Sequence, residues 1–202
     1  MKNLSGKVAL ITGGSKGIGY GIAASLLQQG MYVAITSRDY KAAAKAAEQL
    51  EKEGSGAVLA LEADVRSYQA QERSVEEVLS KWGRLDVLVA NAGVGHFASI
   101  EEMSPEQWNE IIDINLTGVF YSVKAALPAL AETKGYIITI ASLAGTNFFA
   151  KGTAYNASKF GLVGLSQAMM LDLRNKDIKV TTIMPGSVTS HFNEHTPNPA
   201  DA

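Results

Sequence analysis

Short apolar runs rich in branched residues recur along the chain and are separated by polar or mixed stretches. Continuous apolar runs of this length are typical of strands buried on both faces, as in a parallel sheet. The predicted strands are Val8–Ile11, Tyr32–Thr36, Ala57–Leu61, Asp86–Ala90, Tyr136–Ala141 and Lys179–Met184.

Between these runs, apolar residues recur with the spacing of a helix. The predicted helices cover about residues 17–29, 39–53, 67–82, 104–132 and 153–175. Strands that alternate with helices form right-handed βαβ units, and such units assemble into a doubly wound sheet. We therefore expect residues 1–202 to form one three-layer α/β domain of Rossmann type, with a parallel sheet in the strand order 3-2-1-4-5-6.

Composition and charge are those of an ordinary globular protein. The 202 residues are 47% hydrophobic and 19% charged, with a formal net charge of −2 and no cysteine. We expect neither nucleic acid nor a membrane as a partner, because no basic excess is available to bind them. Disulfides and thiolate catalysis are excluded. The segment before the first strand has no apolar stretch of signal-peptide length, and no run approaches the roughly 18 apolar residues of a membrane span, so we expect a cytoplasmic location.

The first predicted strand is followed at once by the glycine-rich segment Thr12-Gly-Gly-Ser-Lys-Gly-Ile-Gly19. Glycines let a backbone turn sharply and approach a pyrophosphate, and the next helix supplies free amides and a favourable dipole. The spacing is T-G-x-x-x-G-x-G rather than the usual G-x-G-x-x-G, and for the motif alone a turn without a ligand remains the alternative. The predicted cofactor contacts in this segment are Gly13, Ser15, Lys16, Gly17, Ile18 and Gly19.

The end of the second strand predicts which dinucleotide binds. Many dinucleotide folds have an acidic residue there, which binds the ribose 2′-hydroxyl. This chain has Ser37 and Arg38, with Lys16 in the glycine segment. Two cations near one ribose suit a 2′-phosphate, so NADP(H) is expected in preference to NAD(H). Two alternatives stay open: the cations are solvated surface charges, or Asp39 reaches the ribose through the loop.

Two further segments follow predicted strands on the expected cofactor side. Asp64 and Val65 follow the third strand, and Asn91-Ala92-Gly93 follows the fourth. Ligands of open α/β sheets bind beyond the carboxyl ends of the strands, so both segments are predicted to contact the cofactor. Each segment taken alone is more often a turn than a site.

Tyr155 and Lys159 are four residues apart on a predicted helix and therefore share one face. They follow Ser142, at the end of the fifth strand. Carbonyl reduction leaves an alkoxide that must gain a proton, and a tyrosine hydroxyl can supply it. We expect the lysine ammonium to lower the tyrosine pKa from about 10 by stabilising the phenolate. Ser142 is suited to hydrogen-bond the substrate oxygen, so the set predicts hydride transfer between a nicotinamide and a carbonyl or secondary alcohol.

With these motifs in this order, the chain resembles the short-chain dehydrogenase/reductase family, and most of all its 3-oxoacyl-acyl-carrier-protein reductases. The resemblance runs from about residue 7 to residue 189. It implies that Tyr155 is the proton donor and acceptor and that Ser142 holds the carbonyl. It also implies that Lys159 holds the nicotinamide ribose and that Asn115 anchors a water in a proton relay. The resemblance places four further residues near the nicotinamide: Pro185, Gly186, Val188 and Thr189.

The resemblance also bears on the substrate and on assembly. Helices 104–132 and 153–175 would pair with a partner subunit, which implies a homodimer or homotetramer. The expected substrate contacts are His96, Phe97, Phe148, Phe149 and His191. Their aromatic character favours an apolar small-molecule carbonyl compound. The alternative is that the phenylalanines belong to the core or to a subunit interface.

Two other functions compete with this interpretation. The segment His191-Phe-Asn-Glu-His195 matches the H-x-x-E-H pattern of zinc peptidases. That pattern needs a helix and a third ligand, whereas here it precedes Thr-Pro-Asn-Pro in the expected substrate loop, so no metal is expected. A dinucleotide-binding regulator with a vestigial active site is the second alternative, and the intact Ser, Tyr, Lys and Asn set argues against it.

The C-terminal part of the chain departs from the resembled family. That family continues past the substrate loop, here about residues 186–202, into another helix and a seventh strand, which are not found before Ala202. We expect the sixth strand to be an open edge and the substrate lid to be incomplete. We therefore expect this chain to be less stable and less active than a full-length member of the family.

Overall fold

The computed structural model describes residues 3–54 and 56–188. Six parallel strands form one sheet in the order β3-β2-β1-β4-β5-β6, which confirms the predicted order. The predicted strand bounds differ from the observed ones by no more than one residue. The strands are β1 (Val8–Ile11), β2 (Tyr32–Ser37), β3 (Val58–Glu62), β4 (Val87–Ala90), β5 (Tyr136–Ile140) and β6 (Lys179–Ile183).

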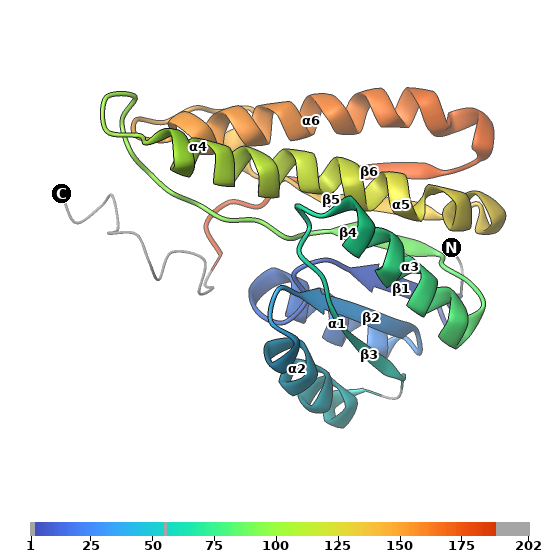
Figure 1. The fold of residues 1–202 in the computed structure, drawn as a ribbon. Coiled ribbons are helices and arrows are strands. Elements are labelled where there is room, and N and C mark those ends of the chain that lie inside the picture. Colours follow the sequence, from blue (N-terminus) through green and yellow to red (C-terminus); the bar gives the residue numbers. More distant parts are fainter. Residues whose placement is uncertain (1–2, 55, 189–202) are drawn as a thin grey trace.

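Helices cover both faces of the sheet (Figure 1). The chain runs from β1 outward to β3 and then from the centre to β6, so right-handed crossovers place the two sets of helices on opposite faces. One face carries α1 (Gly17–Gln28) and α2 (Tyr40–Glu53), and the other carries α3 (Tyr68–Trp82), α5 (Gly118–Thr133) and α6 (Thr153–Leu173). The central strands β1 and β4 are buried along their whole length, which explains their uninterrupted apolar sequence.

The predicted helix over residues 104–132 is divided into three parts. It begins as α4 (Pro105–Ile112), continues as a π-helical turn, η1 (Asp113–Thr117), and ends as α5. A π-helical turn rotates the side chains that follow it relative to those that precede it. Such turns are frequent at functional sites. Asn115 lies inside this turn.

The stretch Pro105–Thr133 is also long and apolar enough to cross a membrane, by length and composition alone. Half of its most apolar window is buried inside the molecule, as in the core helix of a folded domain. The sequence expectation counted uninterrupted apolar residues, whereas this test averages hydropathy over a window. The stretch is therefore weak evidence for a membrane span.

The strand order reverses between β1 and β4, so the loops that follow these two strands diverge. In open α/β sheets this divergence creates the crevice where ligands bind. At one edge of the sheet, β6 pairs only with β5 among the described residues, and the side chains of β6 are partly or fully exposed. Most of the expected substrate loop, residues 186–202, lies outside the part of the chain that the structure describes.

Candidate active site

The glycine segment packs its backbone directly against the loop that follows β4. Gly13 has a φ of +65°, and a Cβ at this position would lie 2.9 Å from Ala92 Cα. A Cβ at Gly19 would lie 2.5 Å from both Gly13 O and Asn91 Nδ2. Side chains are therefore excluded at both positions for steric reasons. The predicted need for glycine arises from backbone packing as well as from an approaching ligand.

Asn91 fixes the glycine segment through hydrogen bonds. Its Nδ2 donates to the carbonyl oxygens of Thr12 and Gly13, each at 3.0 Å. In return, Thr12 Oγ1 accepts from the backbone N–H groups of Asn91 at 3.0 Å and Ala92 at 3.1 Å. These four bonds join the ends of β1 and β4 across the switch point of the sheet. Asn91 therefore shapes the segment as well as lining the crevice.

The N-terminus of α1 suits an anion. Its N-cap residue, Lys16, makes no side-chain capping bond, and the first turn has no acidic residue. The first amide groups of a helix lack intrahelical partners, and the dipole adds partial positive charge there. A dinucleotide pyrophosphate fits this position, since the glycine backbone leaves the room and the helix supplies the donors.

Residues from both halves of the chain line one cavity of about 820 Å³ beyond the carboxyl ends of the strands. The cavity brings together most of the predicted residues: Gly13, Ser15, Lys16, Gly17, Ile18, Ser37, Arg38, Val65, Asn91, Ala92, Gly93, His96, Phe97, Ser142, Phe148, Phe149, Tyr155, Lys159, Pro185, Gly186 and Val188. Three predicted residues do not line it, namely Gly19, Asp64 and Asn115. Two more, Thr189 and His191, lie outside the described residues, as does the His191–His195 segment.

The carboxylates expected near the cofactor have partners of their own. Asp64 binds Arg66 through both oxygens, with Oδ2 2.6 Å from Nη2, and the pKa of Asp64 is lowered mainly by this arginine. Asp39 accepts the Lys41 N–H at 2.9 Å and so caps α2. Neither carboxylate lines the cavity. A cofactor contact by Asp64 stays a prediction.

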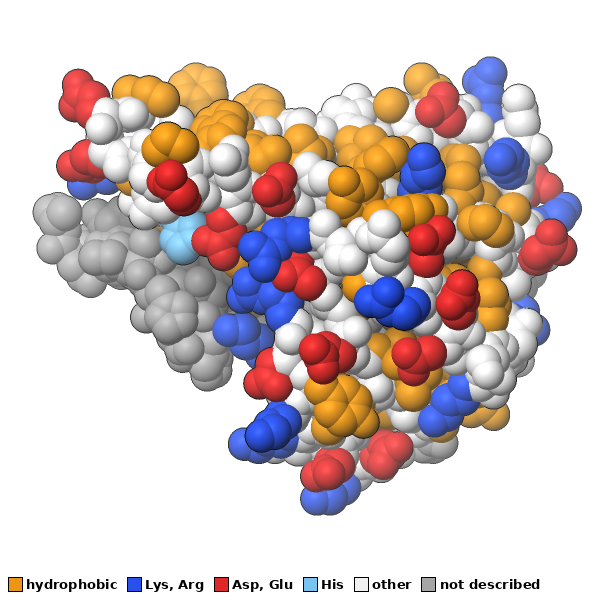
Figure 2. Space-filling model, viewed as in Figure 1, with side chains coloured by type: hydrophobic (Ala, Val, Ile, Leu, Met, Phe, Trp, Pro, Cys, Tyr) orange, Lys and Arg blue, Asp and Glu red, His pale blue; other side chains and the backbone are white. Residues whose placement is uncertain are grey.

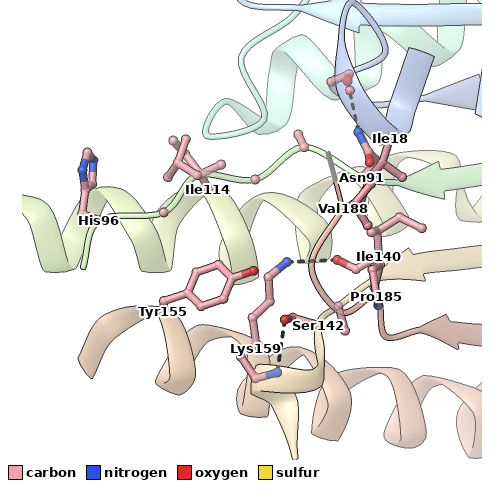
Figure 3. Close-up of a pocket in the computed structure, with 18 of the residues that line it drawn as sticks. Ile18, Asn91, His96, Ile114, Ile140, Ser142, Tyr155, Lys159, Pro185 and Val188 are labelled. Carbon is pink, nitrogen blue, oxygen red and sulfur yellow. Dashed lines mark hydrogen bonds between the residues drawn. The ribbon is translucent and has the colours of Figure 1, made fainter. Parts of the chain in front are cut away.

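Ser142, Tyr155 and Lys159 lie close together at the end of the cavity away from the glycine segment (Figure 3). Ser142 follows β5, and its Oγ accepts the Ala144 N–H at 3.1 Å. Lys159 lies one turn after Tyr155 on α6, with its Nζ 5.7 Å from the centroid of the Tyr155 ring. Lys159 as a whole is 4% exposed, and its Nζ donates to Ile140 O at 3.0 Å. The three groups meet as their order in the sequence predicted.

The pKa values at this end correct one expectation. Burial lowers the pKa of Lys159 to about 8. Burial also raises the pKa of Tyr155, and this effect outweighs the hydrogen bond with Ser142, which lowers it. The prediction of a lowered tyrosine pKa is wrong for these side chains as they are placed, because desolvation of the phenolate exceeds its stabilisation.

Asn115 supports this end from inside the π-helical turn. Its Oδ1 accepts the Val94 N–H at 2.8 Å, and its Nδ2 donates to Val94 O at 2.9 Å and to Ser158 Oγ at 3.1 Å. The side chain is buried, and its bonds join the loop after β4 to α6. Asn115 is thus a positioning residue, and its predicted part in a proton relay stays a prediction.

Two phenylalanine rings pack against the Tyr155 ring. The Phe97 centroid lies 5.4 Å from the Tyr155 centroid, edge to face, and Phe149 lies 6.5 Å away. Phe97 and Phe149 also pack on each other at 5.8 Å. Phe148, by contrast, is 84% exposed. These contacts give the tyrosine an apolar surrounding and help to explain its burial.

The sequence interpretation missed several cavity residues, of which Glu110 and Ile114 are the most informative. They lie four residues apart, so a helical pattern would have placed them on one face. Nothing in the sequence says that this face turns toward the cavity. Its direction depends on how α4 and the π-helical turn pack.

Comparison with known proteins gives consistent results. The chain matches the family described as short chain dehydrogenase over residues 7–200. A 3-oxoacyl-acyl-carrier-protein reductase of Vibrio harveyi is 35% identical over 187 residues, or 92% of this chain and 75% of the relative.

Solved structures agree with that match. An alcohol dehydrogenase from Thermococcus sibiricus, complexed with 5-hydroxy-NADP, has a TM-score of 0.89 at 33% identity, covering 95% of this chain and 81% of that one. A 3-ketoacyl-acyl-carrier-protein reductase from Brucella melitensis, complexed with NADH, has a TM-score of 0.88 at 31% identity, covering 93% and 78%. Similar proteins therefore bind both kinds of nicotinamide dinucleotide.

Proposed function

Because the chain belongs to the short-chain dehydrogenase family, we propose that it is an NADP(H)-dependent carbonyl reductase that also oxidises the corresponding secondary alcohols. One observation carries the proposal. Ser142, Tyr155 and Lys159 line one end of a cavity whose other end is the glycine segment and the N-terminus of α1. A nicotinamide dinucleotide supplies the hydride when it is bound, and the protein's own residues manage the proton and hold the substrate oxygen.

In this proposal Tyr155 Oη supplies the proton during reduction. Burial raises its pKa, which keeps the hydroxyl protonated at neutral pH and so suits a donor. Ser142 Oγ accepts from Ala144 N–H and is hydrogen-bonded with Tyr155, so two hydroxyls are available where a carbonyl oxygen would sit. The nearby Lys159 ammonium stabilises the phenolate that remains once the proton has left.

The preference for NADP(H) rests on the adenosine end of the cavity. Lys16 and Arg38 line the cavity there, whereas the side chain of Asp39 caps α2. Asp39, the acidic residue that could select NAD(H) at the end of β2, is therefore engaged with α2. A 2′-phosphate at this position would meet the Arg38 guanidinium.

The substrate we propose is an apolar carbonyl compound, and a 3-oxoacyl thioester in particular. Phe97 and Phe149 provide the apolar wall beside Tyr155, and the similarity to 3-oxoacyl reductases supports the thioester. Exposed apolar side chains on α5 and α6, such as Phe120 and Phe160, support a homodimer or homotetramer. We also propose a cytoplasmic location, which the lack of cysteine suits.

The test is consumption of NADPH and NADH with an acetoacetyl thioester and a cyclic ketone. We expect turnover with NADPH, and Tyr155→Phe should lower kcat by about 10³-fold because the proton donor is lost. NADPH affinity should not change. Tyr40→Phe, at an exposed tyrosine on α2, is the matched control and should keep full activity.

Two results would contradict the proposal. Tight NADPH binding without turnover of any carbonyl would favour a dinucleotide-binding regulator. An active Tyr155→Phe variant would remove Tyr155 from the role of proton donor.

A further inference from the structure

Glu110 is a carboxylate of the cavity wall that faces two other side chains of the site at once. It lies on α4, and its Oε2 is 2.8 Å from His96 Nε2. Its Oε1 is 3.9 Å from Arg38 Nη1. Arg38 comes from the end of β2 and His96 from the loop after β4. Glu110 thus links Arg38, which is proposed to bind the adenosine ribose, to His96, which is proposed to contact the substrate.

The charges around Arg38 make Glu110 important for a 2′-phosphate. Glu110 is the one side chain within ion-pair distance of Arg38 among the described residues. Arg66 pairs with Asp64, and weaker charge interactions join Arg38 to Asp64 and Glu110 to Arg66. Figure 2 shows acidic and basic side chains next to each other on this face, beside the histidine drawn in pale blue. The cationic site for a phosphate is therefore partly neutralised by the protein itself.

The bond to His96 holds the Glu110 carboxylate in place. A glutamate that is 35% exposed would otherwise be free to turn its charge into solvent. With Oε2 engaged at 2.8 Å, Oε1 stays directed toward the Arg38 guanidinium. A phosphate that binds Arg38 must then displace this carboxylate or remain close to it, and like charges in proximity reduce affinity.

We propose that Glu110 is a specificity-determining residue for the 2′ position of the nucleotide, which acts by holding Arg38 in competition with a 2′-phosphate. NADH carries a hydroxyl there and has no need of Arg38, so Glu110 narrows the difference in affinity between NADPH and NADH. The inference rests on the proposed use of NADP(H) and adds a residue that opposes this preference from within the site.

The test measures the dissociation constants of NADPH and NADH by nucleotide fluorescence, without any substrate. The variants are Glu110→Gln, Arg38→Gln and the double variant. Glu110→Gln removes the charge but keeps a group able to bond His96. We expect it to tighten NADPH binding by about twofold to fivefold, the range of one exposed ion pair, and to leave NADH unchanged. Glu106→Gln, one turn earlier on α4 and exposed, should change neither constant.

The double variant separates action through Arg38 from general effects. With Arg38 replaced, Glu110→Gln should no longer tighten NADPH binding, because the pair that it loosens is gone. The proposal is overturned if Glu110→Gln shifts both nucleotides equally, shifts neither, or acts as strongly without Arg38. If Arg38→Gln alone leaves the NADPH constant unchanged, the NADP(H) preference itself is wrong, which is a separate failure.

Discussion

The two ends of the cavity are built in different ways. At the glycine end, backbone atoms lie in close contact, and four hydrogen bonds of Asn91, Ala92 and Thr12 fix them. At the reaction end, side chains form the site: a buried lysine, a half-buried tyrosine and two phenylalanine rings.

This difference predicts how each end responds to substitution. The glycine end has no spare room, so any added atom disturbs the backbone. The reaction end holds a charged group away from water, which costs stability while it serves the chemistry. Substitutions should therefore damage the first end structurally, whereas at the second end removal of the buried charge should raise stability and abolish activity.

The largest effect is expected for Gly19→Ala, which breaks the glycine end. Its Cβ would lie 2.5 Å from both Gly13 O and Asn91 Nδ2. Because a backbone carbonyl cannot move aside cheaply, we expect a loss of about 1–3 kcal/mol of unfolding free energy. NADPH binding should fall at least tenfold, since the segment must shift. Denaturant unfolding and nucleotide titration would measure the two effects.

Gly21→Ala provides the matched control on the same helix. A Cβ at Gly21 meets nothing within 4 Å, and its position is exposed. Alanine should therefore stabilise α1 by about 0.5–1 kcal/mol through its helix propensity. If both variants change stability and NADPH binding alike, the close backbone contact at Gly19 does not determine either quantity.

What the sequence predicted follows the same division. The strands were recognisable because burial on both faces demands apolar runs. The glycine segment was recognisable because its glycines are closely spaced in the sequence and directly follow a strand. The meeting of Ser142, Tyr155 and Lys159 was predictable from their order along alternating strands and helices. By contrast, the raised pKa of Tyr155 depends on its burial in the folded chain, where Phe97 and Phe149 pack against its ring, and no local pattern records this.

Features that depend on packing between distant segments were not predicted. The π-helical turn around Asn115 interrupts a pattern that looked like one helix. Glu110 on α4 lies 3.9 Å from Arg38, which follows β2, because the fold brings both residues to the wall of one cavity. Both features are set by tertiary structure, which residue types alone do not specify.

The next largest effect is expected at the reaction end, from Lys159→Met. The folded-state pKa of Lys159 is lowered to about 8 from the model-peptide value of 10.5. Between these values the unfolded chain binds more protons, so this lysine makes stability rise with pH through that window. At pH 7 the burial cost is about 3 kcal/mol, and the lost bond to Ile140 O offsets about 1 kcal/mol. Lys159→Met should therefore be about 2 kcal/mol more stable at pH 7, and inactive.

The difference between wild type and Lys159→Met from pH 7 to about 9.5 isolates this group, because Tyr155, whose pKa is raised above 10.0, stays protonated there and distant titrations cancel. The advantage of the variant should shrink as pH rises and the lysine loses its charge. A difference that stays constant with pH, or a variant less stable at pH 7, would show that Lys159 carries no such burial cost.

The smallest effect is expected for Phe97→Leu, which sharpens the contrast between the rings at the reaction end. Phe97 packs edge to face on Tyr155 at 5.4 Å, whereas Phe148 is 84% exposed and has no ring contact among the described residues. Removing the Phe97 contact should cost about 1 kcal/mol of stability. It should also lower the Tyr155 pKa, because water reaches the ring more easily. Phe148→Leu should change neither quantity, and ultraviolet titration of the tyrosines alongside denaturant unfolding would compare the two. Equal effects from both variants would mean that Tyr155 is not shielded by Phe97, and the apolar wall would then have to be sought in Phe149 alone.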